Sequence, residues 1–160
     1  DEITPKNIIL IGPTGVGRIC GMAFGSGGRL YGMDSVNEQL VELDPSTGAG
    51  TVIGQLGMKV GNCGLCYDAQ RDRLLGFDGD TNAVLRFDTV TGAVSVLSQS
   101  SVDFGPVGAE FDPVDGVLLA SDGSTLHRVD PDTGATTTVG PHGLDGVDDL
   151  ALFYGHWPCR

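Results

Sequence analysis

The chain repeats one short signature three times, an Asp-x-x-Thr-Gly turn followed by a run rich in Thr and Val. The signature stands at residues 44–48, 88–92 and 130–134, so it recurs after 44 and then 42 residues. In such a turn the Asp carboxylate accepts backbone N–H groups, and the Gly supplies the left-handed conformation that closes a hairpin. Each repeat also contains four short runs of β-branched and aromatic residues bounded by Gly, Pro or Asp, which predicts four short antiparallel strands.

A repeat of this length with four strands is typical of the blades of a β-propeller. We predict an all-β fold whose four-stranded antiparallel blades cover residues 20–54, 63–98 and 107–140. Residues 8–12 align with the outer strand of a preceding blade, and residues 148–160 with the start of a closing blade. The chain then holds about 3.5 blades in a single domain, residues 1–160. Two alternatives stay open: the ends close a small ring, or another copy completes a larger ring.

Composition supports this fold class and excludes some partners. The 26 Gly and 8 Pro residues suit many tight turns, whereas long helices would need more Ala, Leu, Glu and Lys. With 9 basic against 21 acidic residues the net charge is −12, which argues against nucleic acid as a partner because phosphate binding needs clustered Lys and Arg. The sequence shows no 18-residue apolar run and no basic n-region, so we expect no membrane insertion and see no signal peptide.

The chain has four cysteines, Cys20, Cys63, Cys66 and Cys159. An even number in an acidic β chain favours an oxidising compartment, extracellular or periplasmic. Cys63 and Cys66 lack the following His of a haem site, the second pair of a zinc site and the helix of a thioredoxin-like pair. We predict one structural disulfide that includes Cys159, paired with Cys20 or Cys66, and buried free thiols are the alternative.

One segment resembles a phosphate-binding loop. Residues 2–17 are similar to the Walker A segment of HslU-type ATP-dependent unfoldases, but Arg18 and Ile19 stand where that family has Lys and Ser or Thr. Ile cannot ligate magnesium, and the glycine-rich sequence that follows does not favour the helix that would cradle phosphate. We therefore expect no nucleotide binding.

The remainder of the chain, about residues 8–155, resembles bacterial repeat propellers of the YVTN, NHL and quinoprotein-like kind. In those proteins an Asp-Pro-x-Thr-Gly turn links the last two strands of a blade. The resemblance implies the fold but not an activity, since such rings serve as scaffolds, binding proteins, lyases and hydrolases. The tryptophan-docking pattern of quinoproteins does not recur, because Trp157 is the only tryptophan, so no quinone cofactor is expected.

The loops on one side of the predicted ring gather oxygen-rich side chains around the mouth of its channel. This expected rim consists of Arg18, Asp34, Asn37, Lys59, Asn62, Asp78, Asp80, Asn82, Asp103, Asp122, His142, Asp145 and Asp148. Asp78, Asp80 and Asn82 have the opening spacing of a calcium loop, although its closing acidic ligand is absent, and Asp145 with Asp148 is a second candidate. The rim suits a divalent cation such as calcium, or a polar ligand, better than an anion.

Two residues are the candidates for catalysis. Glu110 occupies an inner-strand position that is Ala or Cys in the other repeats, and a carboxylate lining the channel would be unusual. His142 falls near the predicted mouth. The sequence favours a non-enzymatic, exported propeller that self-associates and binds a protein or a polar small molecule. The alternative is a metal-assisted lyase or hydrolase with a site at the acidic rim.

Overall fold

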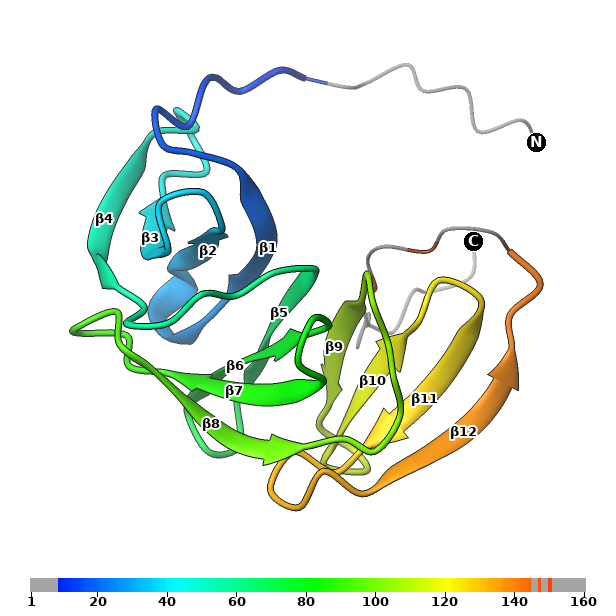
Figure 1. Cartoon of the computed structure of the whole chain (residues 1–160). Coiled ribbons are helices and arrows are strands. Elements are labelled where there is room, and N and C mark those ends of the chain that lie inside the picture. The colour runs from blue at the N-terminus through cyan, green and yellow to red at the C-terminus, as the bar shows by residue number, and fades with distance from the viewer. Residues whose placement is uncertain (1–8, 145–146, 148–149, 151–160) are drawn as a thin grey trace.

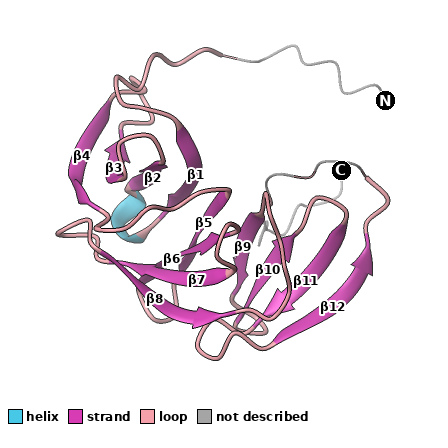
Figure 2. Ribbon diagram, in the orientation of Figure 1, coloured by secondary structure: helices cyan, strands magenta, loops and turns pink. Residues whose placement is uncertain are grey.

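Each repeat folds into one antiparallel sheet of four strands, as the computed structural model shows for residues 9–144, 147 and 150, which are the residues it describes (Figures 1 and 2). The first blade consists of β1 (Ile19–Phe24), β2 (Leu30–Asp34), β3 (Gln39–Leu43) and β4 (Gly50–Gln55). The second has β5 (Cys63–Asp68), β6 (Arg73–Asp78), β7 (Ala83–Phe87) and β8 (Val94–Gln99). The third has β9 (Gly108–Asp112), β10 (Val117–Ser121), β11 (Thr125–Val129) and β12 (Thr136–Pro141). The predicted β-propeller blades are confirmed.

The blades stand side by side in an arc around their inner strands, β1, β5 and β9 (Figure 1). Two glycines allow these strands to approach closely. A Cβ at Gly21 would lie 2.8 Å from the backbone N of Leu65, and one at Gly64 would lie 2.7 Å from that of Ala109. The arc formed by the described residues is open. The expectation of a small closed ring is therefore wrong for this part of the chain.

The repeated signature forms the predicted hairpin turn in every blade. Gly48, Gly92 and Gly134 have φ of +81°, +80° and +75°, the left-handed region that favours glycine. The N–H of each glycine donates to the carbonyl of the leading Asp at 2.7–2.8 Å. The carboxylate of that Asp, at positions 44, 88 and 130, accepts further N–H groups of its own turn. The signature is thus a local folding device.

Apolar side chains fill the space between neighbouring blades rather than one central core. The first cluster joins blades one and two and includes Tyr31, Met33, Leu40, Leu65, Leu74, Leu85 and Phe87. The second joins blades two and three and includes Leu75, Phe77, Val84, Phe104, Phe111, Leu118 and Val129. Each blade therefore needs a neighbour on both faces to bury its apolar side chains.

The disulfide differs from the predicted pairing. Cys20 pairs with Cys63, and the bond joins the heads of two adjacent inner strands, with Cα atoms 5.7 Å apart. Cys66 is a buried free thiol whose pKa is raised by its burial and by the charges of Glu110 and Asp68. The predicted bonds from Cys159 to Cys20 or Cys66 are wrong, and Cys159 itself lies outside the described residues. Cys20 and Cys63 occupy equivalent positions at the heads of neighbouring inner strands, and this equivalence predicts the observed pairing.

Neither end of the predicted ring forms as expected in the described residues. Residues 9–14 form no strand, although 8–12 was predicted as an outer strand. β1 begins directly after Arg18, so the Walker A resemblance has no helix N-terminus to hold phosphate. The predicted closing segment, 148–160, lies almost wholly outside the described residues. Among the described residues, no helix is long and apolar enough to cross a membrane.

Candidate functional site

One face of the first blade carries apolar side chains exposed to solvent. Met22 is 58% exposed, Phe24 60% and Val52 47%. Cross-strand pairing places these side chains on one face of the sheet, in the rows Met22, Gly32, Val41, Val52 and Phe24, Leu30, Leu43, Gly50. This open face, as we call the surface of these two rows, points away from the second blade, because Tyr31 and Met33 on the opposite face pack against that blade.

The first blade covers most of the same face of the second blade, although Val96 on outer strand β8 is 53% exposed. The two rows of that face are Leu65, Gly76, Leu85, Val96 and Tyr67, Leu74, Phe87, Val94. Leu65, Leu74, Leu85 and Phe87 are at most 4% exposed, because they pack against the first blade. The open face therefore has the pattern of an inter-blade interface with no described blade upon it. Exposed apolar patches of this kind mark interaction sites.

The segment before β1 lies where the outer strand of a preceding blade would stand. A Cβ at Gly54, on outer strand β4, would clash with the carbonyl oxygen of Thr91, in the signature turn of the next blade. A Cβ at Gly12 would clash in the same way with the carbonyl oxygen of Thr47, in the signature turn of the first blade. Gly12 therefore contacts the signature turn of the first blade in the same way as Gly54 contacts that of the second blade.

Two of the aspartates expected at the rim are buried and accept hydrogen bonds from the neighbouring loops. Asp34 and Asp78 are at most 1% exposed, and each accepts the N–H of a glycine that precedes an inner strand, Gly17 at 2.8 Å and Gly61 at 3.2 Å. Each also accepts a backbone N–H within its own turn. Asp122 stands 44 residues after Asp78, as Asp78 stands 44 residues after Asp34. Its carboxylate lies 3.2 Å from the Nε2 atom of His127, which takes the place of the glycine N–H.

These hydrogen bonds lower the pKa values of two of the aspartates, Asp34 and Asp122. Burial raises the pKa of Asp34, but hydrogen bonds from Asn37, Gly17 and Val36 to its carboxylate outweigh burial, so the pKa is lowered. Asp122 behaves alike, because bonds from Ser124, Thr125 and His127 outweigh burial. The carboxylates are ionised and already have hydrogen-bond donors, which leaves them poorly suited to a cation.

The calcium candidates are engaged in other contacts. Asp80 accepts the Nδ2 group of Asn62 at 2.6 Å, and Asn82 donates to Asp103 at 3.2 Å while accepting the N–H of Phe104 at 3.0 Å. Over residues 9–144 and positions 147 and 150, no group of three or more His, Cys, Asp or Glu is placed to hold a metal ion. Asp145 and Asp148 lie outside the described residues.

Glu110 lies on the face of the third blade that points away from the second blade. It pairs across the sheet with Leu119, which pairs with Arg128, and this face points away from the second blade, against which Phe111 packs. The carboxylate of Glu110 accepts the N–H of Phe111 on inner strand β9 at 2.8 Å, and its role as a channel-lining carboxylate stays a prediction. Its equivalents in the other blades are Ala23 and Cys66, which lie at inter-blade contacts.

His142 contacts a serine without activating it. The His142 Nε2 atom lies 3.2 Å from Ser121 Oγ, which also accepts the N–H of Gly123. The Nδ1 atom of His142 accepts the N–H of Leu144 at 3.3 Å, so in the neutral imidazole the proton sits on Nε2. The ring then donates to Ser121, whereas a general base would have to accept its proton.

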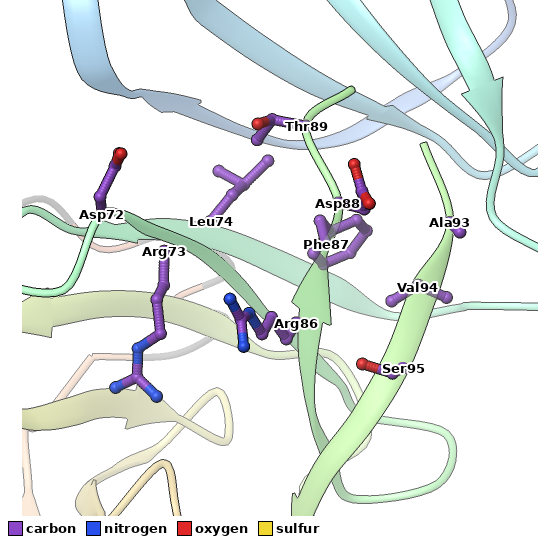
Figure 3. A pocket seen from close by; sticks show the side chains of 10 residues that line it. All are labelled: Asp72, Arg73, Leu74, Arg86, Phe87, Asp88, Thr89, Ala93, Val94 and Ser95. Carbon is purple, nitrogen blue, oxygen red and sulfur yellow. The ribbon is translucent and has the colours of Figure 1, made fainter. Parts of the chain in front are cut away.

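A pocket of about 410 Å³ opens at the end of the second blade where the β5–β6 and β7–β8 turns meet (Figure 3). Arg73 and Arg86 point to the same side of the sheet in this view. Arg73 is 9% exposed and donates to Asp68 at 2.8 and 3.1 Å and to Asp132 of the third blade at 2.7 Å. Arg73 therefore links the second blade to the third through its bonds to Asp68 and Asp132. The equivalent pocket of the first blade, about 470 Å³, contains the Arg29–Glu42 ion pair at 2.6 Å instead.

A smaller pocket of about 190 Å³ lies at the head of the inner strands. All three blades contribute to its lining, which consists of Arg18, Cys20, Asn62, Cys63, Pro106 and Val107. The disulfide therefore forms part of the mouth of the channel. Among the predicted rim residues, Arg18 and Asn62 do meet here.

Comparison with solved structures identifies the same fold. A Bacteroides thetaiotaomicron protein of unknown function is 21% identical, with a TM-score of 0.59 over 73% of this chain and 32% of its own. A chain of the nidogen/laminin complex is 19% identical, with a TM-score of 0.59 over 80% of this chain and 50% of its own. Virginiamycin B lyase from Staphylococcus aureus is 17% identical, with a TM-score of 0.53 over 75% of this chain and 40% of its own.

This chain spans between one third and one half of the length of those structures. At such identities the likeness establishes the β-propeller fold alone. No family model matches the chain, and no curated protein matches it either.

Sequence reasoning missed the open face, although a signal was present. When the inner strands are aligned, Met22 occupies the position of Leu65 and Phe24 the position of Tyr67. Large apolar residues therefore recur at positions that a preceding blade covers. Asking which copy of the repeat has no neighbour would have singled out the first.

Proposed function

We propose that this chain is a non-enzymatic β-propeller module that associates with a second copy of itself through the open face of the first blade. The observation that carries the proposal is the contrast between two equivalent sets of side chains. Met22 is 58% exposed and Phe24 60%, whereas their equivalents in the second blade are covered more, Leu65 to 4% exposure and Tyr67 to a half-buried state. In the second and third blades, the preceding blade packs against the equivalent face.

The energetic argument is the burial of apolar surface. Covering an exposed side chain such as Phe24 contributes about 1.5–3 kcal/mol. Three such side chains, together with those around them, provide the apolar centre that protein interfaces usually have. The acidic composition, with a net charge of −12, keeps the remaining surface soluble and opposes non-specific association.

Light scattering during size-exclusion chromatography tests the proposal. The wild-type chain should show a mass of about twice 16.6 kDa at high concentration and dissociate on dilution. The double variant Met22→Asp with Phe24→Asp should remain monomeric, because charged side chains on the open face oppose its burial.

A matched control is Val90→Asp, since Val90 is 82% exposed and lies in the signature turn of the second blade, away from the open face. That variant should associate like the wild type. A wild-type chain that stays monomeric at every concentration while melting cooperatively would contradict the proposal.

The disulfide supports an exported protein. Cys20 and Cys63 form a bond that persists in oxidising compartments and is rare in the cytosol. We propose an extracellular or periplasmic location on this basis. Retention of the bond in protein recovered from such a compartment, measured by mass spectrometry without reduction, is the test.

A second candidate function is a metal-assisted lyase or hydrolase that uses Glu110 and His142. The observation in its favour is that Glu110 replaces the small residues Ala23 and Cys66 on a face that neighbouring blades otherwise use for packing. A divalent ion retained after dialysis, together with a raised melting temperature, would favour this alternative.

A further inference from the structure

Two arginines of neighbouring strands line the pocket of about 410 Å³ at the end of the second blade (Figure 3). Leu74 pairs with Phe87 across β6 and β7. Arg73 and Arg86 each precede one of these residues, so they lie on one diagonal of the sheet, within reach of long side chains. Two like charges therefore stand close together at this pocket, an arrangement that an anion between them would stabilise.

The first blade has an ion pair on the same diagonal. By the register of its strands, Arg29 is the counterpart of Arg73, and Glu42 is the counterpart of Arg86. The guanidinium of Arg29 donates to the carboxylate of Glu42 at 2.6 Å. The first blade thus supplies a carboxylate of its own at this position, where the second blade has a second guanidinium instead.

The third blade also supplies a partner at this position. Arg128 is the counterpart of Arg86 there, and it pairs with Asp115 and, at 3.8 Å, with Asp112. Arg86 differs, because within the described part of the chain its exposed side chain makes no ion pair and no hydrogen bond. Of the three described blades, the second is therefore the one in which this charged position lacks a partner.

The acidic residues of the pocket lining restrict what an anion there can be. Asp88 accepts the N–H groups of Thr91 at 3.0 Å and Val90 at 2.8 Å. These bonds are the main cause of its lowered pKa, to which the charge of Arg86 contributes least. Asp72 lines the pocket as well. Two carboxylates in the lining disfavour a ligand with several negative charges, so a singly charged anion suits the pocket best.

We propose that this pocket binds the carboxylate of a small organic molecule between Arg86 and Arg73, at the place that the Glu42 carboxylate takes in the first blade. Arg73 donates three hydrogen bonds within the protein and keeps further N–H groups for another acceptor. Ser95 pairs across the sheet with Arg86 and adds a hydroxyl to the lining. The planar guanidinium matches the geometry of a carboxylate, and a volume of about 410 Å³ suits a small ligand.

Nuclear magnetic resonance of the isotope-labelled full chain, titrated with butyrate at constant ionic strength, tests the inference. Amide signals of Arg86, Thr89 and Ser95 should shift together and saturate. Butyramide has the same shape without the charge and should shift none of them. Arg86→Gln should weaken butyrate binding at least tenfold, and Arg86→Glu, which restores the charge pattern of the first blade, should abolish it.

The matched control is Arg128→Gln, since Arg128 occupies the same strand position in the third blade but lies outside the pocket. This variant should bind butyrate like the wild type. Saturable binding that survives Arg86→Gln overturns the site. Shifts that never saturate, or that sulfate reproduces at equal ionic strength, also overturn it, because they report screening of charge rather than a carboxylate site.

This site is independent of the open-face association. It lies at the end of the second blade and uses none of the exposed apolar side chains of the first blade. The double variant Met22→Asp with Phe24→Asp should therefore bind butyrate as the wild type does, so each proposal can fail without the other.

Discussion

Cys20 and Cys63 join two blades at the hub of the molecule, where their inner strands lie side by side. The two cysteines occupy the heads of consecutive inner strands, so a single covalent bond closes a loop that contains almost the whole first blade. Because the first blade contacts only one described neighbour, it depends on this bond more than the second blade does.

Removal of the disulfide should destabilise the protein. Cross-linking residues 43 apart restricts the unfolded chain, so the double variant Cys20→Ser with Cys63→Ser should lose about 2–4 kcal/mol of unfolding free energy. Urea unfolding followed by circular dichroism measures this. The wild type under a reducing agent should match the double variant, and the variant itself should not respond to the reductant. An unchanged midpoint in both cases would mean that the bond has no stabilising role.

Arg73 should be far more important to stability than the equivalent Arg29. Arg73→Ala removes two hydrogen bonds from the buried Asp68, which keeps only Arg71 at 3.3 Å as an ion-pair partner, and breaks the pair with Asp132, so we expect a loss of about 3 kcal/mol. Arg29→Ala breaks a pair whose side chains are 43% and 38% exposed, so the expected loss is below about 1 kcal/mol. Equal effects of the two variants in urea unfolding would contradict the assignment of Arg73 as a buried tie between blades.

Stability should fall in acid because buried carboxylates have lowered pKa values. For Asp34, Asp68 and Asp122, hydrogen bonds to the carboxylate outweigh burial, and the folded pKa lies below the usual value. The stabilisation they provide is complete above the unfolded pKa of about 3.9 and is lost as the pH falls through the folded values. The urea midpoint should thus be flat above about pH 5 and drop below about pH 4.

A matched variant isolates one of these groups. Asp34→Asn retains the shape of the side chain but cannot ionise, so it should be less stable at pH 7 and show a shallower decline in acid. A stability that rises on acidification below about pH 4 would contradict the ionised state assigned to these residues.

Much of the fold could be predicted from the repeat, but the site could not. The Asp-x-x-Thr-Gly turns at residues 44–48, 88–92 and 130–134 depend on contacts within five residues, so local sequence determines them. Asp78 appeared to be a calcium ligand because its spacing from Asp80 and Asn82 is a local pattern. Its burial and its bond to Gly61 arise from the packing of a loop 17 residues away, which local spacing does not contain.

Calcium should have little effect on this protein. Asp78 and Asp80 already accept hydrogen bonds from Gly61 and Asn62, so calcium would have to displace them. We expect no change in melting temperature when calcium is added after dialysis against a chelator. A clear rise that disappears in Asp80→Asn would instead establish a cation site and favour the enzymatic alternative.

The central claim is that the first blade presents a face built for a blade of a second copy, and oxidation of its methionine side chains tests this most directly. Met22 is 58% exposed on the open face, whereas Met33 is fully buried against the second blade and serves as an internal reference. Mass spectrometry after brief peroxide treatment should show rapid oxidation of Met22 in dilute protein, strong protection of Met22 in concentrated protein, and slow oxidation of Met33 in both. Equal oxidation of Met22 at all concentrations would contradict the account.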